Sequence, residues 1–256
     1  QLPDGRTRFR FSTHYITLRM THPSIPFHRI QRIAVLGSGV MGSRIACHLA
    51  QTGSSVLLMD LPSDSGPRDS IAAGHLKAAL KSKPSPLYSK RFTDRIETGN
   101  FDDDLPRIAE CDWIIEVIVE RLDIKQQLFE RVEKFRKPGS LVTSNTSGIP
   151  IAQLSEGRSE DFQKHFCGTH FFNPPRYLPL LEIIPGPLTD PDILLFFTGY
   201  GERILGKQVV LCKDTPAFIA NRVGVFAIQA LFHAVEEMGL SVEAVDKLTG
   251  PAMGRP

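Results

Sequence analysis

The sequence predicts an α/β fold with a doubly wound, mainly parallel sheet, followed by the beginning of an all-α domain. Short apolar runs typical of buried strands alternate with segments of helical periodicity along most of the chain. The alternation stops near Lys213, and the segment 217–238 then places apolar residues around most of a helix circumference. A glycine-rich turn at 37–42 joins the first strand to the first helix.

Each element follows from its own pattern. Mostly apolar runs predict strands at 32–36, 55–60, 95–98, 113–119, 141–144, 167–171, 180–184 and 208–211. Apolar residues at helical spacing predict helices at 41–51, 70–83, 128–135, 192–204 and 217–238. We therefore expect an N-terminal extension over 1–30, an α/β domain over 31–212 and the start of a truncated helical domain over 213–256.

Composition excludes several classes of protein. Apolar residues make up 41% and charged residues 23%, as in ordinary globular proteins, and the formal charge of +2 does not indicate a nucleic-acid partner. No apolar run is long enough for a membrane span, so no membrane association is expected. The four cysteines form no CxxC pair, which argues against zinc and redox sites and fits a reducing compartment.

Both ends of the chain carry signals of their own. The first 19 residues hold four arginines and one acidic residue, which fits either an organelle transit peptide or a gene-start artefact. Met20, shortly before the first strand, favours the second interpretation. At the other end, the apolar helix at 217–238 needs burial. Either a second subunit covers it, or the natural protein continues beyond residue 256.

The glycine-rich turn has the spacing of a dinucleotide-binding motif. Gly37 permits the tight turn, Gly39 lets a pyrophosphate approach the backbone, and Gly42 lets the helix pack closely on the strand. The N-terminus of the next helix offers free N–H groups and a positive dipole end to phosphates. Asp60 ends the second strand, where its carboxylate can accept hydrogen bonds from both ribose hydroxyls and would repel a 2′-phosphate. The pattern predicts a Rossmann-type domain that binds NAD.

Polar segments downstream of this motif point to a family. They lie at 117–122, 143–148, 168–174, 181–183 and 213–222, and include His-Phe-Phe-Asn-Pro and Lys-Asp-Thr-Pro-Ala-Phe-Ile-Ala-Asn-Arg. With the glycine turn, and from about Ile33 to the end, the chain closely resembles the L-3-hydroxyacyl-CoA dehydrogenase family. The resemblance implies reversible hydride transfer between NAD and the C3 hydroxyl of an L-3-hydroxyacyl-CoA, as in fatty-acid β-oxidation.

The resemblance implies catalytic roles for four residues. His170 is the general base, Glu182 orients it, and Ser144 and Asn221 hydrogen-bond the reacting oxygen. The chemistry agrees, because an imidazole can remove a hydroxyl proton near neutral pH and polar groups can stabilise an oxyanion. The hydride passes to the cofactor, so no metal is expected. Ser144 could instead cap a helix after its strand, and Asn221 could be a helix-surface residue.

The resemblance also implies contacts with cofactor and substrate. Glu120 and Lys125 match positions at the nicotinamide half, and the helix after the second strand offers lysines to the CoA moiety, although a solvated lysine face is the alternative. The expected cofactor contacts are Gly37, Gly39, Val40, Met41, Gly42, Asp60, Val117, Glu120, Lys125, Ser144 and Asn173. The expected substrate contacts are Ser144, Asn173, Asn221 and Lys77.

The resemblance also implies partners and a location, and two alternative functions stay open. We expect an acyl-CoA substrate, a homodimer in the full-length form, a possible fusion to an enoyl-CoA hydratase domain, and a cytoplasmic location with the mitochondrial matrix as the alternative. Because the family's second domain continues further, this chain is expected to bind NADH, to turn over acetoacetyl-CoA poorly, and to self-associate through the 217–238 helix or leave it partly disordered. The alternatives are an NAD-dependent dehydrogenase of another hydroxy acid and a non-catalytic NAD(H)-binding protein.

Overall fold

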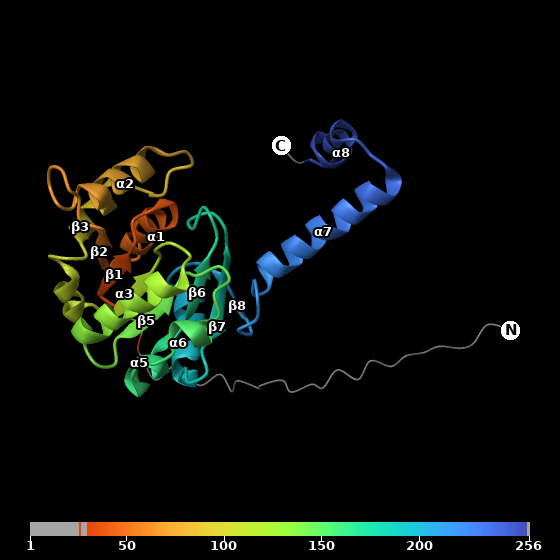
Figure 1. The fold of residues 1–256 in the computed structure, drawn as a ribbon. Coiled ribbons are helices and arrows are strands. Elements are labelled where there is room, and N and C mark those ends of the chain that lie inside the picture. Colours follow the sequence, from red (N-terminus) through yellow and green to blue (C-terminus); the bar gives the residue numbers. More distant parts are fainter. Residues whose placement is uncertain (1–25, 27–29, 255–256) are drawn as a thin grey trace.

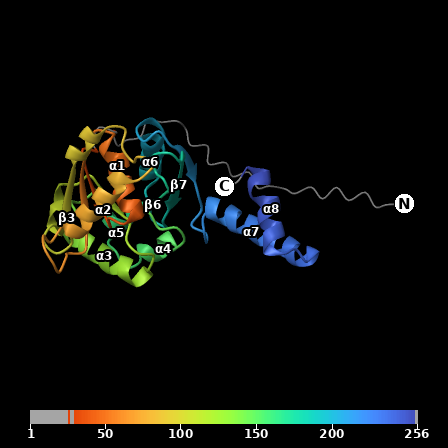
Figure 2. The ribbon, with the colours of Figure 1, turned by 90° about the horizontal axis from the view of Figure 1, so that it is seen from above.

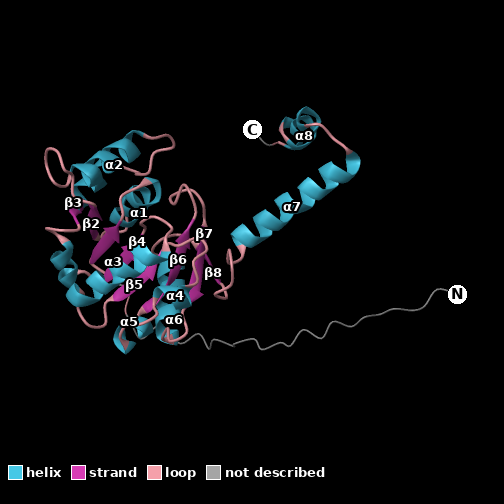
Figure 3. Ribbon diagram, viewed as in Figure 1, coloured by secondary structure: helices cyan, strands magenta, loops and turns pink. Residues whose placement is uncertain are grey.

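A single mixed sheet forms the centre of the molecule. The computed structural model describes residue 26 and residues 30–254, and in them eight strands lie in the order β3-β2-β1-β4-β5-β6-β7-β8. All neighbouring pairs are parallel except β6 and β7, which are antiparallel. Helices lie on both sides of the sheet (Figures 1 and 3). The predicted α/β class with a mainly parallel sheet is confirmed.

The elements have the following bounds. The strands are β1 (Arg32–Leu36), β2 (Ser55–Asp60), β3 (Ile96–Asn100), β4 (Trp113–Glu116), β5 (Leu141–Ser144), β6 (Phe166–Phe171), β7 (Leu180–Pro185) and β8 (Gln208–Leu211). The α-helices are α1 (Val40–Ala50), α2 (Ser70–Lys81), α3 (Leu122–Phe135), α4 (Ile151–Leu154), α5 (Glu160–Lys164), α6 (Pro191–Arg203), α7 (Ala220–Met238) and α8 (Val242–Thr249). Short 3-10 helices are η2 (Lys90–Arg95), η3 (Leu105–Glu110) and η4 (Pro251–Met253).

Each face of the sheet has its own hydrophobic core. On one face, α1 and α6 bury residues such as Ile45 and Phe196 against the strands. On the other, α3, α4 and α5 bury residues such as Phe129 and Phe162. Because β1, β4, β5 and β6 are parallel neighbours, the segments that follow them meet at one edge of the sheet. This edge carries every catalytic candidate except Asn221, which lies on α7.

Some elements begin or end at other residues than the sequence predicts, for identifiable reasons. The strand predicted at 113–119 ends at Glu116, whose side chain accepts a hydrogen bond from the amide of Ile118 and draws the backbone out of the ladder. The helix predicted from 217 begins at Ala220, because Ala217 and Phe218 have φ values of 62° and 50°, outside the right-handed helical region. The short helices α4 and α5 carry too few turns for a periodic signal.

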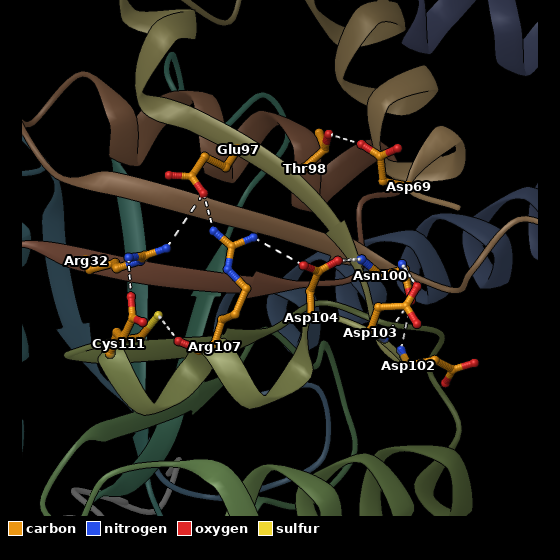
Figure 4. Close-up of polar contacts among 11 residues, drawn as sticks. Arg32, Asp69, Glu97, Thr98, Asn100, Asp102, Asp103, Asp104, Arg107 and Cys111 are labelled. Atoms are coloured by element: carbon orange, nitrogen blue, oxygen red, sulfur yellow. Dashed lines mark hydrogen bonds and ion pairs between the residues drawn. The ribbon is translucent and has the colours of Figure 1, made fainter. Parts of the chain in front are cut away.

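A charged network secures the outer edge strand β3. Glu97 on β3 pairs with Arg107 of η3 and with Arg32 of β1 (Figure 4). Asp104 accepts the backbone N–H of Asn100 at 2.9 Å and pairs with Arg107 at 3.2 Å. Glu97 is exposed and its partners are only partly buried, so each pair contributes little alone, but together they hold η3 against the edge.

Helices α7 and α8 extend away from the α/β body (Figures 1 and 2). No residue of α7 is buried, and its exposed apolar side chains are Val223, Val225, Phe226, Ile228, Phe232 and Met238. The expected self-association of this helix and the proposed domain boundaries stay predictions. Among the described residues, no helix is long and apolar enough to cross a membrane. The predicted N-terminal extension lies almost wholly outside the described residues.

Candidate active site

The glycine turn after β1 has the geometry that a dinucleotide needs. Gly37 has a φ of 103°, and a Cβ atom there would lie 2.6 Å from the carbonyl oxygen of Val117. A Cβ atom on Gly42 would lie 1.8 Å from the carbonyl oxygen of Gly37. A Cβ atom on Gly39 would meet nothing within 4 Å. Two glycines are therefore required by the protein itself, whereas Gly39 leaves open space where a pyrophosphate can approach.

The residues around this turn also fit the cofactor. Helix α1 has no side-chain hydrogen bond at its N-cap and no acidic residue in its first turn, so its positive dipole end is available to phosphates. A cavity of about 460 Å³ adjoins the turn. Its lining includes Gly37, Gly39, Asp60, His75 and Val117. Of the other predicted contacts, Val40 is exposed, and Met41 packs partly against the core.

Asp60 is held at the end of β2 by the turn itself. Its Oδ2 accepts the amide of Ser38 at 2.7 Å and the hydroxyl of Ser38 at 2.5 Å, while Oδ1 accepts the amide of Leu61. His75 of α2 contacts the same serine hydroxyl at 2.8 Å. The carboxylate thus faces the cavity in a fixed position, as a ribose-binding group requires.

A buried histidine–carboxylate pair lies at the same edge of the sheet. Nδ1 of His170 on β6 is 2.8 Å from Oε2 of Glu182, its register partner on β7. Because an ionised carboxylate only accepts, the imidazole donates from Nδ1 and its Nε2 is left as an acceptor. Oε1 of Glu182 accepts the amides of Ile219 and Ala220 at the start of α7. The pair is thus fixed at both ends, an arrangement that suits a base and its orienting group.

The serine that faces His170 is Ser147 and not Ser144. The Oγ atom of Ser147 is 3.2 Å from Nε2 of His170, and the Ser147 side chain is exposed. Nδ2 of Asn221, on α7, lies 3.5 Å from the carbonyl oxygen of Ser147. The structure therefore brings His170, Ser147 and Asn221 together.

Ser144 lies in the interior of the molecule. It is fully buried, donates to Oε2 of Glu116 at 2.5 Å and accepts the amide of Thr146. The hydroxyl of Ser144 is engaged with Glu116 in the interior, whereas that of Ser147 lies beside His170, so the predicted contact of Ser144 with cofactor or substrate stays a prediction. The signal that could have identified Ser147 is its place beyond the end of β5, where the chain leaves the sheet at the ligand edge.

Glu120 and Lys125 form one cluster beside Ser147. Oε1 of Glu120 accepts the hydroxyl of Thr146 at 2.6 Å and the amide of Ser147 at 2.8 Å. Burial raises the pKa of Glu120, but the Thr146 hydrogen bond and the Lys125 charge outweigh burial and hold the pKa below its ordinary value. Lys125 is only 1% exposed and pairs with Glu116 at 2.5 Å and Glu120 at 3.3 Å. The structure therefore presents Glu120 to a ligand, whereas Lys125 lies behind it.

The remaining substrate candidates lie further from His170. Asn173 is exposed, and its Oδ1 accepts a hydrogen bond from Arg44 of α1 at 2.7 Å. Lys77 is exposed on α2 and lines a separate cavity of about 580 Å³ with Lys81. The predicted substrate contacts of Asn173 and Lys77 stay predictions.

Comparisons with known proteins agree with this geometry. Residues 32–215 match the family model described as 3-hydroxyacyl-CoA dehydrogenase, NAD binding domain. A probable 3-hydroxyacyl-CoA dehydrogenase of Bacillus subtilis is 50% identical over 242 residues, covering 89% of this chain and 31% of the relative. One of Deinococcus radiodurans is 46% identical over 228 residues, covering 89% of this chain and 66% of the relative. The chain thus spans about a third to two thirds of the length of these relatives.

A solved structure supports the same conclusion. The crystal structure of an Escherichia coli 3-hydroxybutyryl-CoA dehydrogenase is 31% identical, with a TM-score of 0.71, and the match covers 81% of this chain and 43% of that one. The predicted cofactor, NAD, is confirmed by the family match. The chain belongs to the 3-hydroxyacyl-CoA dehydrogenase family, whose NAD-binding domain it carries.

Proposed function

We propose that the protein oxidises the C3 hydroxyl of an L-3-hydroxyacyl-CoA reversibly, with NAD, in fatty-acid β-oxidation. The observation that carries the proposal is the His170–Glu182 pair at 2.8 Å, placed at the sheet edge that also holds the glycine turn. A base and a cofactor site at one edge are what alcohol oxidation by hydride transfer requires. The names of the relatives give the substrate class.

The proposed chemistry begins with proton removal. Nε2 of His170 takes the proton of the substrate hydroxyl, because Nδ1 is committed to Glu182. The carboxylate of Glu182 stabilises the imidazolium that forms and holds its tautomer. When bound, NAD supplies the acceptor for the hydride. In the reverse direction the same imidazolium returns the proton to the carbonyl oxygen.

The neighbours of His170 position the reacting oxygen and exclude water. Ser147 Oγ marks the place where a substrate oxygen can lie within reach of both the hydroxyl and Nε2. The rings of Phe172 and Phe218 lie 4.5 and 5.8 Å from the imidazole ring, measured between centroids. Their apolar surface shields the base from bulk water, which strengthens its interaction with Glu182. Asn221 is proposed to hold the loop of Ser147 from α7.

The test is a comparison of substrates with the same protein. NADH oxidation is measured with acetoacetyl-CoA and, separately, with free 2- and 3-keto acids of equal chain length. We expect turnover with acetoacetyl-CoA to exceed turnover with every free acid, and His170→Gln to abolish it. Preference for a free acid would favour a dehydrogenase of another hydroxy acid. Absence of turnover, with NADH bound tightly, would favour a non-catalytic protein.

The wider assembly is part of this proposal. A homodimer, a fusion to an enoyl-CoA hydratase domain and a cytoplasmic location stay predictions. The relative from Bacillus subtilis supports the idea of further domains, because only 31% of its length is matched. Size measurement by light scattering on the natural gene product tests the first two.

A further inference from the structure

A fully buried ion pair lies directly beneath the active-site loops. Glu116, the last residue of β4, is 0% exposed, and Lys125 of α3 is 1% exposed. Oε1 of Glu116 accepts Lys125 Nζ at 2.5 Å and the amide of Ile118 at 2.7 Å. Oε2 accepts the hydroxyl of Ser144 at 2.5 Å. Buried charges of this kind lower stability unless they are paired, so a glutamate in an otherwise apolar strand, paired with a buried lysine of the neighbouring helix, requires an explanation.

The hydrogen bonds indicate that Glu116 is ionised. Ser144 Oγ accepts the amide of Thr146, so its own hydrogen is directed to Glu116. All three partners of Glu116 are therefore donors, which suits an acceptor-only carboxylate. Burial holds the pKa of Glu116 above its ordinary value, and the charge of Lys125 and the three hydrogen bonds offset part of that rise.

The pair is connected to the catalytic base by direct contacts. Lys125 Nζ also pairs with Oε2 of Glu120 at 3.3 Å. Oε1 of Glu120 accepts the amide of Ser147 at 2.8 Å, and Ser147 Oγ lies 3.2 Å from Nε2 of His170. Glu116, Lys125 and Glu120 together carry one net negative charge. Only Glu120 is substantially exposed, with 44% of its side chain accessible.

The sheet order places this cluster on the path of the cofactor. The glycine turn follows β1, Glu120 follows β4, Ser147 follows β5, and His170 lies on β6. These strands are consecutive neighbours in the sheet, so a dinucleotide that reaches from the turn to His170 crosses the loops of Glu120 and Ser147. The hydride-accepting ring must therefore lie beside Glu120, an inference that rests on the proposed function.

We propose that Glu116 sets the preference of this site for the oxidised over the reduced cofactor, through the net charge that it gives the cluster with Lys125 and Glu120. The oxidised nicotinamide ring is positively charged and the reduced ring is neutral, so a negative cluster favours the oxidised form. Without Glu116, Lys125 would neutralise Glu120 and that preference would fall. Glu116 itself touches neither ligand, because it acts through Lys125 and Glu120.

The experiment measures two dissociation constants for each variant. NADH binding is followed by its fluorescence, and NAD⁺ binding by competition with NADH. Glu116→Gln keeps the shape of the side chain and one acceptor oxygen, which can stay on Lys125 and the amide of Ile118, while an NH2 donor replaces the oxygen that faces Ser144 and the charge is removed. We expect it to weaken NAD⁺ relative to NADH by about fivefold, the order expected for one charge acting over several ångströms at an effective dielectric constant near 20 to 40. Because binding is measured, the result is independent of whether acetoacetyl-CoA is turned over.

Three further variants separate charge from structure. Glu116→Gln with Lys125→Met restores a net charge of −1, so the ratio of the two constants should return to that of the parent protein. Ser144→Ala removes a hydrogen bond from Glu116 without changing charge, so it should lower stability and leave the ratio unchanged. Glu120→Gln changes an accessible side chain and should shift the ratio at least as far as Glu116→Gln.

Three results would overturn the proposal. In folded Glu116→Gln, an unchanged ratio would show that the buried charge does not reach the ring, and a further shift in the double variant would indicate structural damage instead of charge. If Glu116→Gln does not fold, Glu120→Gln decides alone. An unchanged ratio in that variant would show that the cluster does not face the cofactor.

Discussion

Replacing Ser144 and Ser147 separately by alanine should have opposite consequences. Ser144→Ala leaves Oε2 of Glu116 without its donor and the amide of Thr146 without its acceptor, both in the interior. A buried polar group left unsatisfied costs about 1–3 kcal/mol. For a protein of this size, a loss of about 2 kcal/mol lowers Tm by roughly 4–8 °C. Turnover, scaled to the folded fraction, should change little in comparison.

Ser147→Ala should instead impair the reaction and preserve the fold. Ser147 is exposed, so its substitution should change stability by less than about 0.5 kcal/mol. Loss of a hydroxyl that stabilises a reacting oxygen lowers turnover by about 100-fold or more. The dissociation constant of NADH should stay within a factor of about two, because the hydroxyl points to His170.

Thermal unfolding and NADH oxidation with acetoacetyl-CoA are measured on both variants and the parent. The two serines are matched controls for each other, since each substitution removes one hydroxyl from the same segment. If Ser144→Ala lost turnover while keeping its Tm, and Ser147→Ala kept turnover, the assignment drawn from their positions would be refuted.

Three other predictions concern the cofactor site and the core. Gly39→Ala should weaken NADH binding and leave Tm unchanged, because a Cβ atom there points into the open space that the cofactor needs. Gly42→Ala should lower both the affinity for NADH and Tm, because its Cβ atom would lie 1.8 Å from a carbonyl oxygen. Equal losses of Tm in the two variants would contradict this. Asp60→Ala should weaken NAD⁺ binding and narrow the preference for NAD⁺ over NADP⁺, measured by competition with NADH; an unchanged preference would remove Asp60 from the ribose site. Burial, and then the charge of Lys207, lower the pKa of His48 from 6.5 to about 4. Between these two pH values only the unfolded chain binds the proton, so the free energy of unfolding should fall by up to about 3 kcal/mol as the pH drops from 6.5 to 4. Urea unfolding at several pH values should show this slope, and His48→Leu should flatten it.

The sequence predicted the sheet well because buried strands have a strong local signal. Runs such as 32–36 and 141–144 coincide with β1 and β5, and their apolar content leaves few other solutions. The glycine turn was also predictable, since Gly37 and Gly42 each meet a local steric demand and Gly39 leaves room for the ligand. His170 and Glu182 lie twelve positions apart, and their contact depends on the antiparallel register of β6 and β7. That register cannot be derived from composition alone, and the family resemblance supplied the pairing.

The features of the site that the sequence did not reveal have a common physical origin. Ser144 and Ser147 lie in the same polar segment, and only the point where β5 ends decides which hydroxyl is buried. The burial of Lys125 was equally hidden, because helix periodicity does not show that Glu116 and Glu120 converge on it. One signal was present, since a glutamate inside the apolar run 113–116 requires a buried partner.

The most direct test of the central claim uses His170→Gln and the two properties that it should separate. Turnover of acetoacetyl-CoA with NADH and the dissociation constant of NADH are measured on the variant and the parent. We expect a loss of turnover of at least about 100-fold with the dissociation constant of NADH unchanged, because Nε2 acts on the substrate proton and not on the cofactor. A folded His170→Gln protein that keeps most of its turnover would contradict the assignment of His170 as the general base.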